Sequence, residues 1–278
     1  MQRTISPPGR LKAASDMPRA CLEAGTVAMN WWWLRQLPKG DGHPVMVIPG
    51  FAGSDTYNKP LIHFLQRQGY HAVGWKQGVN LGHSHLDIDR LSDRVDKLYS
   101  REGRPISLIG HSLGGIFARE TARRYPDKVR LVMSLGSPVA RARNAASNLN
   151  VLYRQMNTTP AEIEESDWHL PPPVPTTALY SRFDGVLDWR VCLQASGHAQ
   201  TENVEVMGSH NGLTLNAMSW IVIADRLAQP EWHWRPFRHN RLWRLLFKKP
   251  AWRPESSGSK SAYNAHYDDQ TASQQASA

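Results

Sequence analysis

The hydrophobic positions of this chain gather into short apolar runs that alternate with segments of helical spacing. The run Val-Met-Val-Ile at 45–48 contains no polar position, as expected of a strand buried on both faces of a sheet. Other runs predict strands at 71–75, 106–109, 129–135, 176–180 and 203–206, and helical spacing predicts helices at 87–99, 113–124 and 212–227. This alternation predicts an α/β fold with a mostly parallel central sheet flanked by helices.

The segments on either side of this alternation differ from it in composition. We expect an N-terminal extension at 1–43, loose up to about residue 18 and helical over 20–37, before one α/β domain at 44–228. A polar stretch at about 140–175 predicts a small cap insertion in that domain. A basic aromatic C-terminal arm follows at 229–253, and the Ser/Gln/Ala-rich segment 254–278 predicts a disordered tail.

Composition excludes several classes of protein. With 2 cysteines in 278 residues, the chain is neither a disulfide-rich secreted scaffold nor a Cys-based zinc module. No apolar run reaches the roughly 18 residues of a membrane span, and no secretory signal is visible at the N-terminus. We therefore expect a cytoplasmic protein in which Cys21 and Cys192 are free thiols.

The strongest chemical signal is the sequence Gly-His-Ser-Leu-Gly at 110–114, a G-x-S-x-G motif centred on Ser112. It follows the predicted strand at 106–109 and opens the predicted helix at 113–124. A nucleophile elbow requires this context, because its serine occupies a strained turn and its glycines let neighbouring backbone approach. A similar stretch around Ser84 has neither the closing glycine nor a preceding apolar strand, so Ser112 is the candidate nucleophile.

With this motif in its strand–helix setting, the sequence resembles the α/β-hydrolase superfamily, in particular its lipase- and esterase-like members, over about residues 44–228. The resemblance implies a catalytic triad in the order Ser, Asp, His, with the acid after a late strand. Asp184 follows the strand at 176–180 and precedes Gly-Val, which matches the family's acid position. Asp188 is the alternative acid, and a further alternative is that Asp184 only caps a turn.

The same resemblance places the histidine in the loop after the last strand. His210 stands there between two glycines, at 208 and 212, and precedes a predicted helix. His111 adjoins the serine, but neighbouring side chains diverge in a tight turn, and His198 precedes the last strand. The sequence therefore predicts His210 as the general base.

An oxyanion hole needs two backbone N–H donors. One is expected from Leu113, the residue after the nucleophile, and by resemblance the other comes from Phe51, in the Pro-Gly-Phe-Ala-Gly loop after the first buried strand. Pro49 stands where many family members have a histidine, which removes a side chain but no donor. Alternatively, Phe51 is simply a core or pocket aromatic.

A metal site is the weaker chemical hypothesis. His83, His85, Asp87 and Asp89 alternate in a pattern that loosely resembles the first ligand run of binuclear zinc hydrolases, but no second ligand cluster accompanies it. The two aspartates also fit the first turn of the next helix. We therefore expect no metal and no organic cofactor.

The arm at 232–253 carries seven Lys/Arg residues and no acidic residue, and four of the 11 tryptophans lie in it. Basic residues interleaved with aromatic rings suit peripheral contact with an anionic membrane. Two other interpretations stay open: the tryptophans of the arm pack on the domain, beside Trp31 to Trp33, or the arm binds nucleic acid, which nothing else in the chain supports.

Together these features predict a serine hydrolase that cleaves a small carboxylic ester or lipid-like substrate through Ser112, Asp184 and His210 and an acyl-enzyme. The alternatives are an acyltransferase with the same triad and a non-catalytic, membrane-associated scaffold. Six apolar residues are expected either to line an apolar substrate pocket or to form the core of the cap: Phe51, Val139, Leu149, Val151, Leu152 and Met156.

Overall fold

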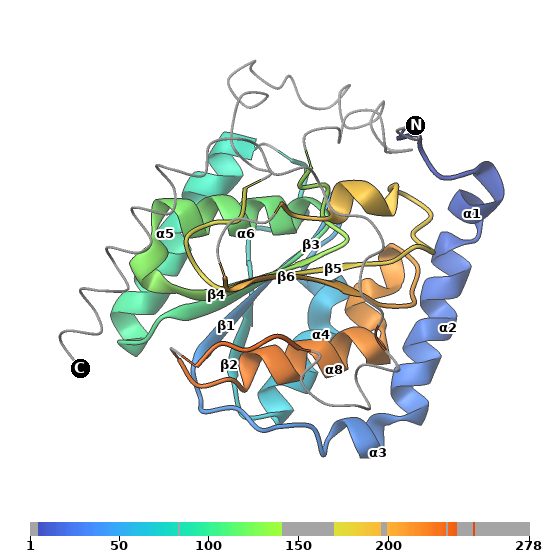
Figure 1. The fold of residues 1–278 in the computed structure, drawn as a ribbon. Coiled ribbons are helices and arrows are strands. Elements are labelled where there is room, and N and C mark those ends of the chain that lie inside the picture. Colours follow the sequence, from blue (N-terminus) through green and yellow to red (C-terminus); the bar gives the residue numbers. More distant parts are fainter. Residues whose placement is uncertain are drawn as a thin grey trace.

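The computed structural model describes residues 5–82, 84–140, 170–195, 199–231, 233–237 and 247, with only the backbone of residues 84 and 85. Its centre is a six-stranded sheet in the order β2-β1-β3-β4-β5-β6, in which every neighbouring pair of strands is parallel (Figure 1). The α/β fold predicted from the alternation of strands and helices is therefore confirmed. The strands are β1 (Pro44–Ile48), β2 (His71–Gly74), β3 (Ile106–His111), β4 (Val129–Leu135), β5 (Thr176–Tyr180) and β6 (Thr201–Glu205).

Helices cover both faces of the sheet, as Figure 1 shows: α5 (Ser84–Glu102) and α6 (Leu113–Arg124) lie on one face, and α4 (Asp55–Arg67) and α8 (Ala217–Leu227) on the other. The bounds of α6 are those that the sequence predicts. Helix α4 is absent from the prediction, because it carries polar residues and Pro60 in its interior. Short 3-10 helices complete the described domain: η1 (Pro126–Lys128), η4 (Trp189–Cys192) and η5 (Asn211–Leu215).

The strands are buried on both sides, which explains their continuous apolar runs. In β1, Val45 and Val47 belong to the hydrophobic cluster that also contains residues of α4 and α8, whereas Met46 and Ile48 belong to the cluster with residues of α5 and α6. Trp220 of α8 stacks on Phe64 of α4 with ring centroids 4.5 Å apart. The alternation of side chains along a strand thus divides one apolar run between two cores.

Strand order fixes where a ligand crevice can open. The chain passes from β1 to β2 on one side and then to β3 on the other side of β1. The loops that follow β1 and β3 therefore lead away in opposite directions, and in open parallel sheets ligands bind at such a switch point, beyond the carboxyl ends of the strands. The loop with Phe51 follows β1, and Ser112 follows β3.

The N-terminal extension departs from its prediction. Helices α1 (Arg10–Ala14), α2 (Asp16–Met29) and α3 (Trp31–Leu34) are formed, so the expectation of a loose segment up to residue 18 is wrong, and the helix expected at 20–37 is divided at Asn30. Trp31 packs on Phe64 and Trp220, which attaches α3 to the domain core.

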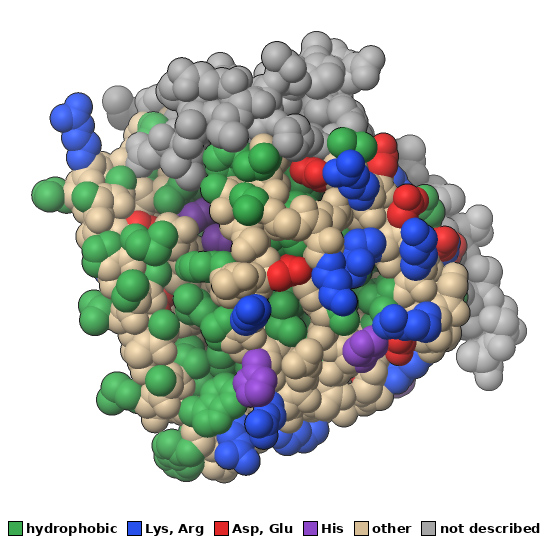
Figure 2. Space-filling model, turned by 180° about the vertical axis from the view of Figure 1, so that it is seen from behind, with side chains coloured by type: hydrophobic (Ala, Val, Ile, Leu, Met, Phe, Trp, Pro, Cys, Tyr) green, Lys and Arg blue, Asp and Glu red, His purple; other side chains and the backbone are tan. Residues whose placement is uncertain are grey.

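Helix α2 is unusual because it buries an acidic side chain and exposes several apolar ones. Its buried residues are Asp16, Ala20 and Val27, while Met17, Leu22 and Met29 are 52%, 73% and 79% exposed. Figure 2, from behind, shows hydrophobic side chains along the edge that α1–α3 occupy. Burial of one Ala and one Val contributes about 2–4 kcal/mol, so apolar packing alone holds α2 weakly.

Several predictions about the rest of the chain fall wholly or partly on residues outside the described ones. The centre of the expected insertion, 141–169, the tail at 254–278 and most of the arm at 229–253 are among these. Of the arm, Phe237 and Phe247 are fully buried and contact each other edge to face, 4.7 Å between centroids, in the core cluster of α4 and α8. These two phenylalanines pack on the domain, whereas Trp234, the one tryptophan of the arm among the described residues, is only partly buried. Within the described part of the chain, no helix has the length and apolarity to cross a membrane.

Candidate active site

Ser112 occupies a sharp turn between β3 and α6. Its backbone has φ 49° and ψ −119°, a conformation that costs a non-glycine residue about 1–3 kcal/mol. The surrounding backbone holds this turn, because the Ser112 N–H donates to the Leu135 carbonyl oxygen at 2.8 Å and the Ser112 carbonyl accepts from the Gly115 N–H at 3.0 Å. The turn has the form of a nucleophile elbow, with the serine at the amino end of a helix.

The glycines of the motif are explained by close approaches. A Cβ atom at Gly110 would lie 2.3 Å from the Gly114 carbonyl oxygen, and one at Gly114 would lie 2.6 Å from the carbonyl oxygens of Ile48 and Pro49. At Gly115 a Cβ would lie 2.0 Å from Ser137 Oγ. The helix therefore starts directly against the ends of β1 and β4, which no larger residue would permit.

Asp184 and His210 meet across two loops. We name residues 181–188, after β5, the acid loop, and residues 206–216, after β6, the histidine loop. Asp184 Oδ2 lies 2.7 Å from His210 Nδ1, and both side chains are almost fully buried. The other oxygen, Asp184 Oδ1, accepts from the backbone N–H groups of Val186 and Leu187 at 2.8 and 2.7 Å. Asp184 thus both caps its turn and binds the histidine.

The protonation of His210 follows from this contact. Burial alone would lower the pKa of His210, but the charge of Asp184, its hydrogen bond and the charge of Asp16 outweigh burial and raise that pKa above 6.5. Because Nδ1 is bound to the carboxylate, the proton of the neutral ring stays on Nδ1. Nε2 is then the basic atom.

The alternative acid, Asp188, is engaged elsewhere. Its Oδ1 accepts from the Arg190 backbone N–H at 3.0 Å and from Arg190 Nε at 2.9 Å, which makes it the N-cap of η4. The hydrogen bond to His210 is made by Asp184.

His111 joins the elbow to the histidine loop. Its Nε2–H donates to the His210 carbonyl oxygen at 2.9 Å, and the two rings lie 5.0 Å apart. Burial and the nearby His210 lower the pKa of His111 to about 4, so its ring is neutral at pH 7. His111 is therefore a structural donor that brings the Ser112 turn against the loop carrying His210.

The loop after β1 lies against the same turn. A Cβ at Gly50 would lie 3.0 Å from Ser112 Cβ, which places the neighbouring Phe51 beside the nucleophile. The Phe51 side chain is partly buried against the core cluster of α5 and α6. Leu113 is the first residue of α6, so its N–H belongs to the unpaired amino end of that helix.

The metal-ligand pattern receives no support from the side chains that are described. Asp87 is buried and Asp89 pairs with Arg124 at 2.5 Å, while the side chains of His83 and His85 lie outside the described set. Across the described residues, no group of three or more His, Cys, Asp or Glu side chains could hold a metal ion. Cys21 and Cys192 are free thiols, as predicted.

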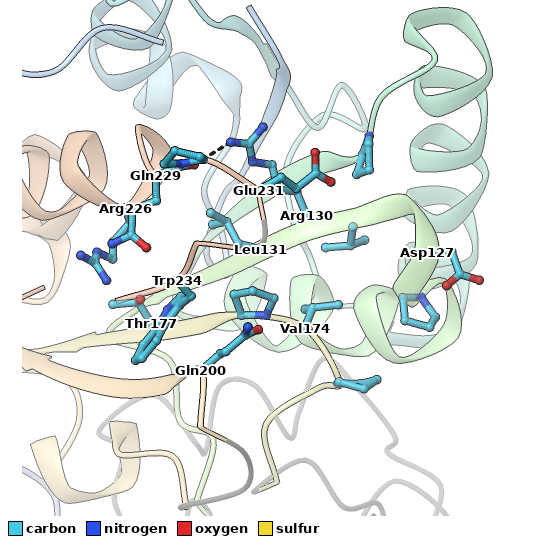
Figure 3. A pocket seen from close by; sticks show the side chains of 16 residues that line it. Asp127, Arg130, Leu131, Val174, Thr177, Gln200, Arg226, Gln229, Glu231 and Trp234 are labelled. Carbon is cyan, nitrogen blue, oxygen red and sulfur yellow. Dashed lines mark hydrogen bonds between the residues drawn. The ribbon is translucent and has the colours of Figure 1, made fainter. Parts of the chain in front are cut away.

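A cavity of about 200 Å³ opens at the opposite end of the sheet (Figure 3). Its lining includes Val129 and Leu131 from the amino-terminal part of β4, together with Thr177, Arg226 and Trp234. Ser112 follows the carboxyl end of β3, so this cavity is separate from the candidate site.

Of the expected pocket residues, Val139 is buried and Phe51 is partly buried. The other four lie outside the described residues, as does His198: Leu149, Val151, Leu152 and Met156.

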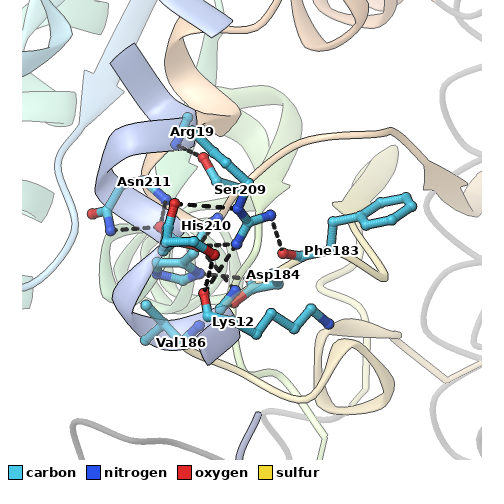
Figure 4. A network of polar contacts seen from close by, with 12 residues as sticks. Lys12, Arg19, Phe183, Asp184, Val186, Ser209, His210 and Asn211 are labelled. Carbon is cyan, nitrogen blue, oxygen red and sulfur yellow. Dashed lines mark hydrogen bonds and ion pairs between the residues drawn. The ribbon is translucent and has the colours of Figure 1, made fainter. Parts of the chain in front are cut away.

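Two acidic residues that the sequence analysis passed over lie behind the candidate site. Asp16 and Glu23, both on α2, accept hydrogen bonds from the acid and histidine loops. Figure 4 shows part of this region, with Asp184 of the acid loop and His210 of the histidine loop close to Arg19. They stand seven residues apart, or two helical turns, which places both carboxylates on one face of α2. That spacing was visible in the sequence, but the segment around Asp16 was expected to be loose.

Part of the chain is similar in sequence to known proteins. Residues 79–213 match the family model of the PGAP1-like alpha/beta domain. The chain is 32% identical over 109 residues to the pimeloyl-[acyl-carrier protein] methyl ester esterase of Shewanella woodyi, which covers 39% of this chain and 41% of that protein. It is 29% identical over 147 residues to the serine hydrolase BPHL of Homo sapiens, covering 46% of this chain and 50% of that protein. The chain thus spans half or less of the length of these relatives.

Among solved structures, the fold is similar to that of Aspergillus fumigatus lipase B, with a TM-score of 0.55 and 15% sequence identity, over 68% of this chain and 53% of the lipase. That identity supports the fold alone. The chain therefore has an α/β-hydrolase fold with a strained serine turn between β3 and α6, and its sequence is similar to those of an esterase and a serine hydrolase.

Proposed function

We propose that the protein is a serine hydrolase that cleaves a carboxylic ester through an acyl-enzyme on Ser112. Asp184 binds His210 Nδ1 and orients the ring, and His210 Nε2 takes the proton of the Ser112 hydroxyl as Oγ attacks the ester carbonyl. The tetrahedral intermediate collapses with release of the alcohol, which receives that proton from His210. Water, activated by the same base, then hydrolyses the acyl-enzyme.

The oxyanion is assigned to two backbone donors, the N–H groups of Phe51 and Leu113. Leu113 opens α6, so its N–H and the positive end of the helix dipole both favour negative charge beside Ser112. The closeness of Gly50 to Ser112 supports a donor from the loop after β1. In this proposal Phe51 acts through its backbone N–H, and the position of its side chain does not affect that role.

One observation carries the proposal: a serine held at positive φ at the amino end of α6, joined through His111 to the loop of a histidine that binds a buried carboxylate. A structural turn has no need of this strain. The two sequence relatives are a methyl ester esterase and a serine hydrolase. For this chain we propose the same general chemistry, on a small ester or lipid-like substrate.

The test uses a fluorophosphonate probe, which phosphonylates an activated serine with loss of fluoride, followed by peptide mapping of the adduct. We expect one adduct, on Ser112, and turnover of p-nitrophenyl esters whose rate varies with acyl chain length. Labelling at another serine, or at none, would contradict the proposal. Product analysis with an added alcohol separates hydrolysis from acyl transfer, since an acyltransferase would form a new ester.

Peripheral membrane contact through 232–253 stays a prediction, and co-sedimentation with anionic vesicles at low and high salt would measure it.

A further inference from the structure

We infer that α2 is a positioning element of the active site: its two inward carboxylates, Asp16 and Glu23, hold the acid and histidine loops in the register that lets Asp184 and His210 meet. This inference rests on the proposed function for its catalytic meaning, although the contacts themselves do not. Asp16 and Glu23 are positioning residues, since each touches the loops and neither touches the reacting atoms.

Asp16 connects the two loops through a single oxygen atom. Its Oδ2 accepts from the Gly185 N–H at 2.9 Å and from the His210 N–H at 2.8 Å. Gly185 directly follows Asp184, so this atom is bound to the neighbour of the proposed acid and to the backbone of the proposed base. Oδ1 accepts from the backbone and side-chain nitrogens of Asn211, at 3.0 and 2.8 Å. Four N–H groups thus converge on one buried carboxylate.

Glu23 holds the histidine loop two helical turns further along α2. Its Oε1 accepts from the Ser209 N–H at 2.6 Å, and its Oε2 from Asn216 Nδ2 at 2.9 Å. Asn216 Oδ1 is already the N-cap of α8, where it accepts from the Met218 N–H at 2.8 Å. The two carboxylates therefore bind both ends of the segment 209–216.

Glycines in the two loops are explained by α2. A Cβ at Gly185 would lie 2.8 Å from Asp16 Oδ2, and one at Gly212 would lie 2.1 Å from Glu23 Oε2. At Gly208 the distance to Glu23 Oε2 would be 2.9 Å. Glu23 of α2 thus lies close to both glycines that flank His210, and a larger side chain at either position would collide with it.

The distribution of apolar and acidic side chains on α2 argues that the contacts of Asp16 and Glu23 with the two loops are not incidental. The helix buries only two small apolar side chains, whereas its acidic side chains face inward and its exposed residues on the other side include Leu22. A helix packed for stability alone would bury its apolar residues and expose its charges. Arg19 adds a further bond, from Nη1 to the Phe183 carbonyl oxygen at 2.7 Å, next to Asp184.

The charge of Asp16 also reaches His210. Burial would raise the pKa of Asp16, but the hydrogen bonds from Asn211, His210 and Gly185 outweigh burial and lower it, so Asp16 is ionised at neutral pH. Its negative charge helps to raise the pKa of His210. Among the described residues, the titratable and charged groups around His210, Asp16 and Glu23 are Asp184, His111, Lys12, Arg19, Tyr57, Cys21 and Cys192.

The decisive variant is Asp16→Asn. An amide has one acceptor oxygen and one donor nitrogen, so the nitrogen would face N–H donors that now bind a carboxylate oxygen. We expect kcat for a p-nitrophenyl ester to fall about 10- to 100-fold with little change in KM, because the variant disturbs alignment and not substrate binding. The acid limb of kcat/KM should move to lower pH, since the loss of a negative charge lowers the pKa of His210.

Two control variants isolate the effect. Leu22→Ala changes the outward side of the same helix, and Asp93→Asn removes an exposed carboxylate on α5, so both should keep wild-type kcat and pH profile.

A second test variant is Glu23→Gln, which should lower kcat and shift the acid limb in the same direction as Asp16→Asn, but more weakly. It replaces Asp16→Asn in the test if circular dichroism shows that the Asp16 variant does not fold. Wild-type kcat and an unmoved acid limb in the folded Asp16 or Glu23 variant would overturn the inference.

An NMR titration separates this inference from the proposed function. The imidazole nitrogens of His210 are followed in the Ser112→Ala background, with and without Asp16→Asn, which requires no turnover. We expect the pKa of His210 to fall and its low-field Nδ1 proton resonance to shift when Asp16 is replaced. If this shift occurs but no probe labels Ser112 in the wild type, the proposed hydrolase function fails and the positioning role stands. If Ser112 is labelled but His210 is unmoved, the positioning role fails.

Discussion

Ser112 and the Asp184–His210 pair are positioned by different means. The serine turn is held by its own neighbours: glycines at 110, 114 and 115, the strand before it and the helix after it. The acid and histidine loops follow edge-side strands and are held by α2, whose Asp16 lies 168 residues before Asp184 along the chain (184 − 16). One half of the site is therefore encoded locally, and the other half depends on a distant helix.

The difference predicts how each half responds to substitution. A change in the locally encoded half should act on the nucleophile directly. A change in the remotely held half should alter the alignment and the protonation of the base. The following experiments test this contrast, beginning with the largest expected effect.

Replacing the nucleophile should have the largest effect. Ser112→Ala removes the attacking oxygen, so we expect ester turnover to fall on the order of 10⁴- to 10⁶-fold, while the circular dichroism spectrum and Tm stay near those of the wild type. The measurement is steady-state hydrolysis of a p-nitrophenyl ester. Near-normal turnover by this variant would show that the serine turn is not the reaction centre.

Substitution of the two aspartates of the acid loop should lower kcat to very different extents. Asp184→Asn removes the charge that orients His210 and stabilises its protonated form, so we expect a loss of kcat of about 10⁴-fold. Asp188→Asn weakens the N-cap of η4 and its pairing with Arg190, which should cost about 1 kcal/mol of stability and little kcat. If the order of the two kcat losses were reversed, the catalytic acid would be Asp188.

Two glycine variants compare a crowded position with an open one. In Gly115→Ala the new Cβ would meet Ser137 Oγ at 2.0 Å, so we expect the free energy of unfolding to fall by about 1–3 kcal/mol. Gly25→Ala lies on exposed α2 with no atom within 4 Å of the new Cβ, and it should stabilise the protein by about 0.5–1 kcal/mol. Urea denaturation measures both, and adding Ser137→Gly should restore much of the first loss. Equal changes in the free energy of unfolding for the two variants would contradict the close approach of Gly115 to Ser137.

The pH dependence of the wild type gives the smallest and most specific effect. The pKa of His210 is raised above 6.5, and the neutral ring is the base, so kcat/KM should fall as the pH decreases through that raised pKa. We expect the midpoint of the acid limb above pH 6.5. His111, with a pKa of about 4, stays neutral over this range and should contribute no inflection there. A single limb centred below pH 6 would contradict the assignment of His210 as the base.

Prediction from sequence succeeded where the signal is local. The apolar runs predicted strands close to their observed bounds. Both ends of α6 were also predicted correctly, because a glycine-rich turn precedes the helix and its apolar spacing is regular. It failed where tertiary contacts override local propensity. Helix α4 contains Pro60, and the start of α2 contains Pro18 and charged residues, yet both helices form against the domain.

The sequence by itself determined the parallel α/β architecture and the serine turn, since both depend on the periodicity of side chains and on short-range steric limits. Through a family resemblance it also predicted Asp184 and His210 as acid and base, two residues that are hydrogen-bonded to each other in the structure. Only the tertiary structure decided which aspartate binds the histidine and what holds the two loops together. These depend on atoms far apart in the chain, and hydrogen bonds of this kind leave no pattern in the order of residues. In the sequence, Asp16 is simply one acid in a polar segment.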